Sequence, residues 1–224
     1  MRITMRRVKR PIVTSLNHPG GPDVNDRIAI DLSAAQKSAE RVRSLLLKLW
    51  ATHDLQRYEY TRTVRIAPSG PCYSHPVLTL NGNFQAEEQV LCTYLHEQMH
   101  WYLTWYSHGN TSGWQEIWDA LRQAYPSLPI GFPEGANDEF SSCLHIIVNY
   151  LEIEAVSNVL GQDVARGLAA KNFIYRGLYE IVLRDWEPLT ALYRRHGLSP
   201  IRSAGEMSEH DLQLAARMDE APLA

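Results

Sequence analysis

The chain has 224 residues, a formal net charge of −3 and 45% apolar residues, values that are ordinary for a globular domain in water. This charge gives no general attraction to nucleic acid or to anionic membranes, and no stretch approaches the roughly 18 consecutive apolar residues of a membrane helix. We therefore expect neither a nucleic acid nor a membrane as a partner. The three cysteines, Cys72, Cys92 and Cys143, are widely spaced and form no disulfide framework. This pattern indicates a reducing, cytoplasmic environment.

The two ends of the chain differ in composition from the middle. Residues 1–27 combine a basic cluster with several turn-forming residues, which predicts an irregular N-terminal arm, and they lack the apolar segment of a secretory signal. Residues 201–224 are polar and predict a C-terminal tail. Between them, residues 28–200 carry apolar residues at helical and strand spacing, which predicts a single domain.

The predicted elements of this domain begin with a helix over about 33–53, for which Ser33 is a plausible N-cap. Two short strands follow, one within 58–68 and one within 76–84. A long, uninterrupted helix is expected over 86–105. A loop rich in proline and glycine occupies 126–138, and the remaining helices are expected over 114–125, 139–160, 163–185 and 187–196. A helix, two strands and then several helices predict an α+β fold.

The helix over 86–105 carries the sequence His96-Glu97-x-x-His100 on a polar strip, and the rest of its surface is mainly apolar. Such a helix is expected to be buried, so its polar strip needs partners or a cavity. Two histidines four residues apart lie on one helix face and can bind the same Zn²⁺ ion. The glutamate beside the first histidine can then act as the general base of a hydrolase.

The segment "HPVLTLNGNFQAEEQVLCTYLHEQMHW", residues 75–101, resembles the core of the zincin metallopeptidases, in which an edge strand precedes the H-E-x-x-H helix. The resemblance implies a zincin-like domain in which His96 and His100 bind zinc and Glu97 is the general base. The metzincin continuation H-x-x-G-x-x-H is absent, because the next histidine, His108, comes eight positions after His100. The third zinc ligand must therefore come from elsewhere in the chain.

We expect this third ligand on the helix over 139–160. Glu152 lies on an apolar face of that helix, where a carboxylate is costly to bury without a cation. The stretch Glu152-Ile153-Glu154-Ala155 also resembles the E-x-E-A sequence of gluzincin-type families, which implies that the first glutamate binds zinc. Glu154 faces the other way and is expected in solvent.

His145 is the main alternative to Glu152 as the third ligand. The two residues are about 10.5 Å apart along the helix axis, so we do not expect both to bind one ion. Glu134 and Glu139 are lesser alternatives. If Glu152 binds zinc, His145 either lines the cleft and stabilises an oxyanion or is a hydrogen-bonded core histidine.

Tyr175 and Tyr179 are spaced four apart in the predicted helix over 163–185. A tyrosine hydroxyl near zinc can stabilise an oxyanion, which makes Tyr175 a candidate for that role. Packing of both rings in the core is the simpler interpretation.

These observations predict a zinc-dependent hydrolase, most simply a metallopeptidase acting on a peptide or protein substrate. The stretch "PVLTLN" would bind an extended peptide along an exposed strand edge. One alternative is a non-catalytic protein of the same fold, with a structural zinc ion and a regulatory or protein-interaction role. Another is a zinc-free helical domain in which the motif arose by chance. Glu97 favours the enzyme, because a purely structural site has no use for a base there. The oligomeric state is left open.

Overall fold

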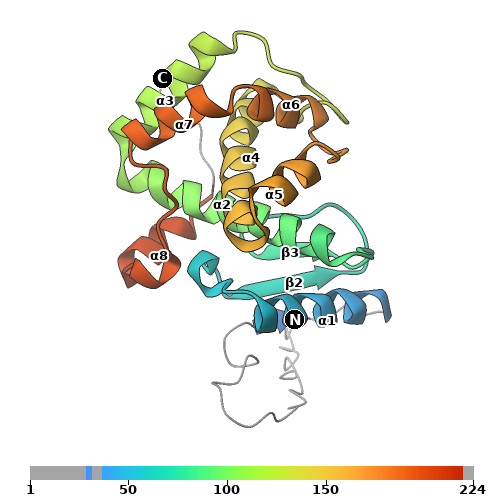
Figure 1. The fold of residues 1–224 in the computed structure, drawn as a ribbon. Coiled ribbons are helices and arrows are strands. Elements are labelled where there is room, and N and C mark those ends of the chain that lie inside the picture. Colours follow the sequence, from blue (N-terminus) through green and yellow to red (C-terminus); the bar gives the residue numbers. More distant parts are fainter. Residues whose placement is uncertain (1–28, 32–36, 219–224) are drawn as a thin grey trace, which may run out of the picture.

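A computed structural model describes residues 29–31 and 37–218 of the chain (Figure 1). The predicted N-terminal arm and the predicted N-cap Ser33 lie outside the described residues. The described part is a mixed fold that consists mostly of helices and includes a small parallel sheet. At this level the predicted α+β class is confirmed.

The sheet has the strand order β1 (Ala29–Asp31), β2 (Thr63–Ala67) and β3 (Leu78–Asn81), and neighbouring strands are parallel. Alternate side chains of β2 are buried, including Val64 and Ile66, as expected for a half-buried strand. Both β2 and β3 are shorter than the stretches from which they were predicted. The stretch before β2 instead contains a short 3-10 helix, η2 (Gln56–Tyr58).

The outer edge of β3 is covered by the chain itself, contrary to the expectation of an exposed edge. Tyr73 and Thr79 form an antiparallel bridge in which each backbone N–H donates to the carbonyl of the other, at 3.0 and 2.7 Å. The segment around Tyr73 therefore lies between β3 and any incoming peptide. After β3 the chain turns at Gly82, where a Cβ atom would come within 2.7 Å of the Ala67 carbonyl oxygen.

Helices α1 (Lys37–Thr52) and α2 (Glu87–Gly109) pack against each other, and each contacts the sheet. One face of α1 is buried, with Val42 and Leu46 fully inaccessible, as its helical spacing predicts. Helix α2 is buried on most sides along its length. Its first turn carries Glu87 and Glu88, whose charges favour a helix N-terminus.

Helix α4 (Glu139–Leu160) is the second central helix, and in Figure 1 it crosses α2 steeply. Its bounds are those predicted. It is preceded by Asp138, whose side chain accepts a hydrogen bond from the backbone N–H of Ser141, and followed by Gly161. By length and composition α4 could cross a membrane, but it is mostly buried and packs against α2, α5 and α6. It is therefore part of the core of the described fold.

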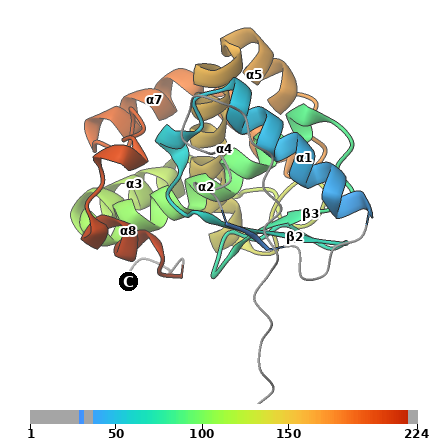
Figure 2. The same ribbon diagram turned by 90° about the horizontal axis from the view of Figure 1, so that it is seen from below.

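The remaining helices surround this pair, and Figure 2 shows them from a second direction. Their bounds are α3 (Thr111–Ala124), α5 (Gln162–Ala169), α6 (Arg176–Arg184), α7 (Trp186–Arg195) and α8 (Glu209–Ala215), with a 3-10 helix, η3 (Ala204–Glu206), before α8. The single helix predicted over 163–185 is thus two helices, α5 and α6, joined by an irregular connection.

The segment predicted as a polar tail contains α8, which packs against α2. The indole Nε1 of Trp105 donates to Asp211 Oδ1 at 2.8 Å, and Ala215 is fully buried. The backbone carbonyl of Ala215 is also 2.9 Å from Nε2 of His75. The described residues from 201 onward therefore belong to the folded domain.

Candidate metal centre

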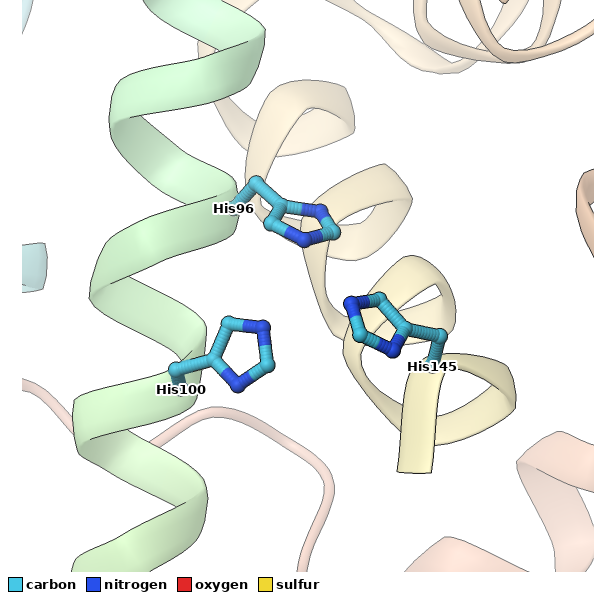
Figure 3. A group of neighbouring side chains, drawn as sticks. All are labelled: His96, His100 and His145. Atoms are coloured by element: carbon cyan, nitrogen blue, oxygen red, sulfur yellow. The ribbon is translucent and has the colours of Figure 1, made fainter. Parts of the chain in front are cut away.

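Three histidines from two helices meet at the crossing of α2 and α4. His96 and His100 project from one face of α2, and His145 projects toward them from α4 (Figure 3). One ring nitrogen from each residue lies within 4.8 Å of the corresponding atoms of the other two. All three residues are less than a tenth exposed. This arrangement could hold a metal ion.

Hydrogen bonds orient two of the three imidazoles. His145 Nδ1 is 2.6 Å from the backbone carbonyl oxygen of Ser141, which can only accept, so this nitrogen carries the proton. His96 Nδ1 is 2.9 Å from Glu152 Oε2, and this carboxylate oxygen likewise accepts the hydrogen bond. Both rings are thereby left with a lone pair on Nε2, the form of histidine that binds metals.

The structure places Glu152 behind His96 and not in the histidine cluster. The Tyr179 hydroxyl donates to the same Oε2 atom that accepts from His96, so this buried carboxylate already has two donors. This differs from the prediction that Glu152 is the third ligand, and it favours the alternative, His145. The reason is the crossing angle of the helices, which brings His145 to the face of α2 that carries His96 and His100.

Glu97 and Tyr175 lie beside the cluster. Glu97 is buried and lines the cleft described below. The Tyr175 ring is centred 4.2 Å from that of His145. Burial and, to a lesser extent, the charge of Glu97 raise the pKa of Tyr175, so its hydroxyl keeps its proton at neutral pH.

The prediction that Tyr175 lies within a helix is wrong. This residue lies immediately before α6 and has a left-handed backbone with φ 61°. Non-glycine residues seldom adopt this conformation. Contacts with a distant part of the chain hold it: the Arg176 N–H donates to the Pro133 carbonyl at 2.9 Å, and the Arg176 guanidinium pairs with Glu134. The loop over 126–138 therefore fixes the position of the Tyr175 side chain.

A cleft of about 870 Å³ leads to the three histidines. Glu97, Tyr175, Glu152 and Tyr179 line it together with two thiols, Cys72 and Cys92, whose pKa values are raised mainly by burial, that of Cys72 to about 12. Both thiols therefore stay protonated near neutral pH. The remaining lining residues are Pro71, Tyr73, Ser74, His75, Phe84, Glu88, Gln89, Thr93, Leu168, Lys171, Asn172, Phe173, Ile174 and Met218.

The other acidic candidates have roles away from the histidines. Glu134 forms the ion pair with Arg176, and Glu139 lines a separate, smaller pocket. Glu154 was expected in solvent, but its carboxylate accepts from Ser199 Oγ at 2.8 Å and from the backbone N–H of Ile201 at 3.3 Å. It thereby ties α4 to the segment that leads to α8.

The donor set fits zinc. Three neutral imidazoles are a known ligand set for this ion, and tetrahedral Zn–N bonds of about 2.0–2.1 Å place the nitrogens about 3.4 Å apart. The ring nitrogens lie within 4.8 Å of one another and would have to move closer together to reach that separation. Comparisons of the chain with protein-family models, with curated proteins and with solved structures give no match. The resemblance to zincins therefore stays a prediction.

Proposed function

We propose that the protein is a zinc-dependent hydrolase, most simply a metallopeptidase, with His96, His100 and His145 as its zinc ligands. The observation that carries this proposal is the convergence of three imidazoles, two of them oriented by hydrogen bonds, next to Glu97 in the lining of a large cleft. Zinc bound at such a site polarises a carbonyl group and lowers the pKa of a water molecule.

The cleft favours an enzyme over a protein with a purely structural zinc. Structural zinc sites are closed by four protein ligands, whereas catalytic sites have three and keep one position open. Among the described residues the cluster contains three histidines, and each of them lines the cleft.

The roles of the neighbouring side chains follow from their positions. Glu97 adjoins a ligand and lines the cleft, where its carboxylate can take a proton from the attacking water. The protonated Tyr175 hydroxyl can donate to an oxyanion that forms on the substrate. Glu152 and Tyr179 hold His96 in position and contact no reacting atom in this proposal.

The segment around Tyr73 supports a peptide substrate better than β3 does. Because Tyr73 directs its N–H and C=O toward Thr79, alternation along an extended segment turns the backbone groups of Cys72 to the other side, whereas the Ser74 carbonyl accepts from Trp101 Nε1 at 2.8 Å. Residues 71–75 all line the cleft. An extended peptide can therefore pair with the backbone of Cys72 in the cleft that the histidines line.

Replacing the general base tests the proposal. We expect Glu97→Gln to retain one zinc ion per chain and to hydrolyse a fluorogenic peptide library at least about 10²-fold more slowly than wild type. Glu154→Gln, which alters a carboxylate on α4 outside the cleft, is the control and should retain activity. Equal activity of Glu97→Gln and wild type would remove Glu97 from the mechanism.

We also propose a reducing, cytoplasmic setting. In the structure Cys72, Cys92 and Cys143 are free thiols, which supports this setting.

A further inference from the structure

The exposed large apolar side chains gather at the mouth of the cleft. Among the described residues seven such side chains are substantially exposed, and four of them line the cleft: Tyr73, Phe173, Ile174 and Met218. A fifth, Phe132, packs edge-to-face against Phe173 with the ring centroids 5.4 Å apart. Exposed apolar groups that gather around one concavity mark a binding surface, whereas scattered ones need no explanation.

The connection between α5 and α6 presents two of these side chains in a fixed way. The Ile174 N–H donates to Asn172 Oδ1 at 3.0 Å, a local turn that directs the chain just before Tyr175. Phe173 reaches Phe132 on the loop over 126–138, which is the same loop that holds Arg176. The apolar pair is therefore built onto the support that positions Tyr175.

We infer that the cleft selects a polypeptide segment carrying several large apolar side chains, which Phe173, Ile174, Tyr73 and Met218 contact while the backbone passes the histidines. This inference rests on the proposed function and adds the class of substrate. A cleft of about 870 Å³ lies near the upper end of small-molecule sites and has room for several residues. Such segments are exposed in unfolded proteins and are buried in folded ones.

The shape and charge of the site favour a polypeptide over a bilayer surface. The apolar side chains surround a concavity whose lining includes three glutamates and one lysine, and the chain has a formal net charge of −3; the charged lining residues are Glu88, Glu97, Glu152 and Lys171. An anionic bilayer would be repelled by the excess of negative charge, and a flat surface would not reach the buried histidines that line the cleft.

The test uses the full-length, zinc-loaded Glu97→Gln protein and two fluorescent peptides that differ only in a central block, leucine and phenylalanine in one and serine in the other. By fluorescence anisotropy we expect the Kd of the apolar peptide to be at least about tenfold lower than that of the serine peptide. Burial of one large apolar side chain corresponds to a ratio of this size. Phe173→Ser should abolish most of this preference. Val164→Ser, which alters an exposed apolar residue on α5 outside the cleft, should not change it.

Equal binding of the two peptides would overturn the inference, as would a preference that Phe173→Ser leaves intact. If the protein sediments with phosphatidylcholine–phosphatidylglycerol vesicles and Phe173→Ser abolishes this sedimentation, the inference is also overturned, in favour of a membrane surface. Hydrolysis by the wild-type protein separates the two proposals. Selective binding without any hydrolysis would contradict the proposed function alone, and hydrolysis of both peptides at equal rates would contradict the inference alone.

Discussion

Removal of the Tyr179 hydroxyl should weaken zinc binding, because this hydroxyl supports Glu152, the carboxylate that holds the proposed ligand His96. Tyr179 donates to Glu152, and Glu152 accepts from His96, so the hydroxyl helps to fix the orientation of one ligand. Loss of such a supporting group typically lowers metal affinity 10–100-fold, which corresponds to about 1.4–2.8 kcal/mol. The Glu152 side chain is 5% exposed, so water replaces the lost donor poorly.

We therefore expect Tyr179→Phe to raise the zinc Kd about 10–100-fold, measured by competition with a chromophoric chelator. The free energy of unfolding of the metal-free protein should also fall by about 1.5–3 kcal/mol, the contribution of a hydrogen bond to a charged group. Tyr150→Phe is the matched control. It removes a buried hydroxyl that is 2.9 Å from Thr190 Oγ1, away from the cleft, and should leave the zinc Kd unchanged. A Kd for Tyr179→Phe within twofold of wild type would refute the reasoning.

Two further predictions concern the oxyanion donor and α8. Tyr175→Phe should keep zinc and lower kcat for peptide hydrolysis about 10²–10³-fold, and a kcat within a few-fold of wild type would exclude this role. Hydrogen bonds lower the pKa of Asp211 to about 2, and the bond from Trp105 has a larger effect than those from Ser208. Because this pKa is depressed, the stabilisation is present above about pH 4 and is lost as the pH falls through 2. Asp211→Asn should therefore reduce the free energy of unfolding by about 1 kcal/mol at pH 7 and much less at pH 2, and a difference independent of pH would contradict the pKa.

The sequence predicted best what depends on local periodicity. The apolar spacing around His96 and around Glu152 located α2 and α4 within a few residues. His96, Glu97 and His100 face one cleft because the spacing within one helix decides it.

The sequence could not predict what depends on contacts between distant segments. His145, and not Glu152, lies next to His96 and His100 because two helices cross there, and the periodicity within α4 does not predict that crossing. The break before Tyr175 requires the Pro133 carbonyl, which lies more than 40 positions away in the chain. Helix α8 was not predicted because it lies in a polar stretch and is held by contacts with α2, which is distant in the sequence, such as the hydrogen bond from Trp105 to Asp211.

Metal analysis of purified protein tests most directly whether the three histidines form a zinc site. Wild type isolated without added metal should contain close to one zinc ion per chain, and His145→Ala should lose it. His210→Ala, which changes an exposed histidine on α8, should keep it. Wild-type protein without zinc, or His145→Ala with a full complement of zinc, would contradict the assignment of His96, His100 and His145 as the ligands.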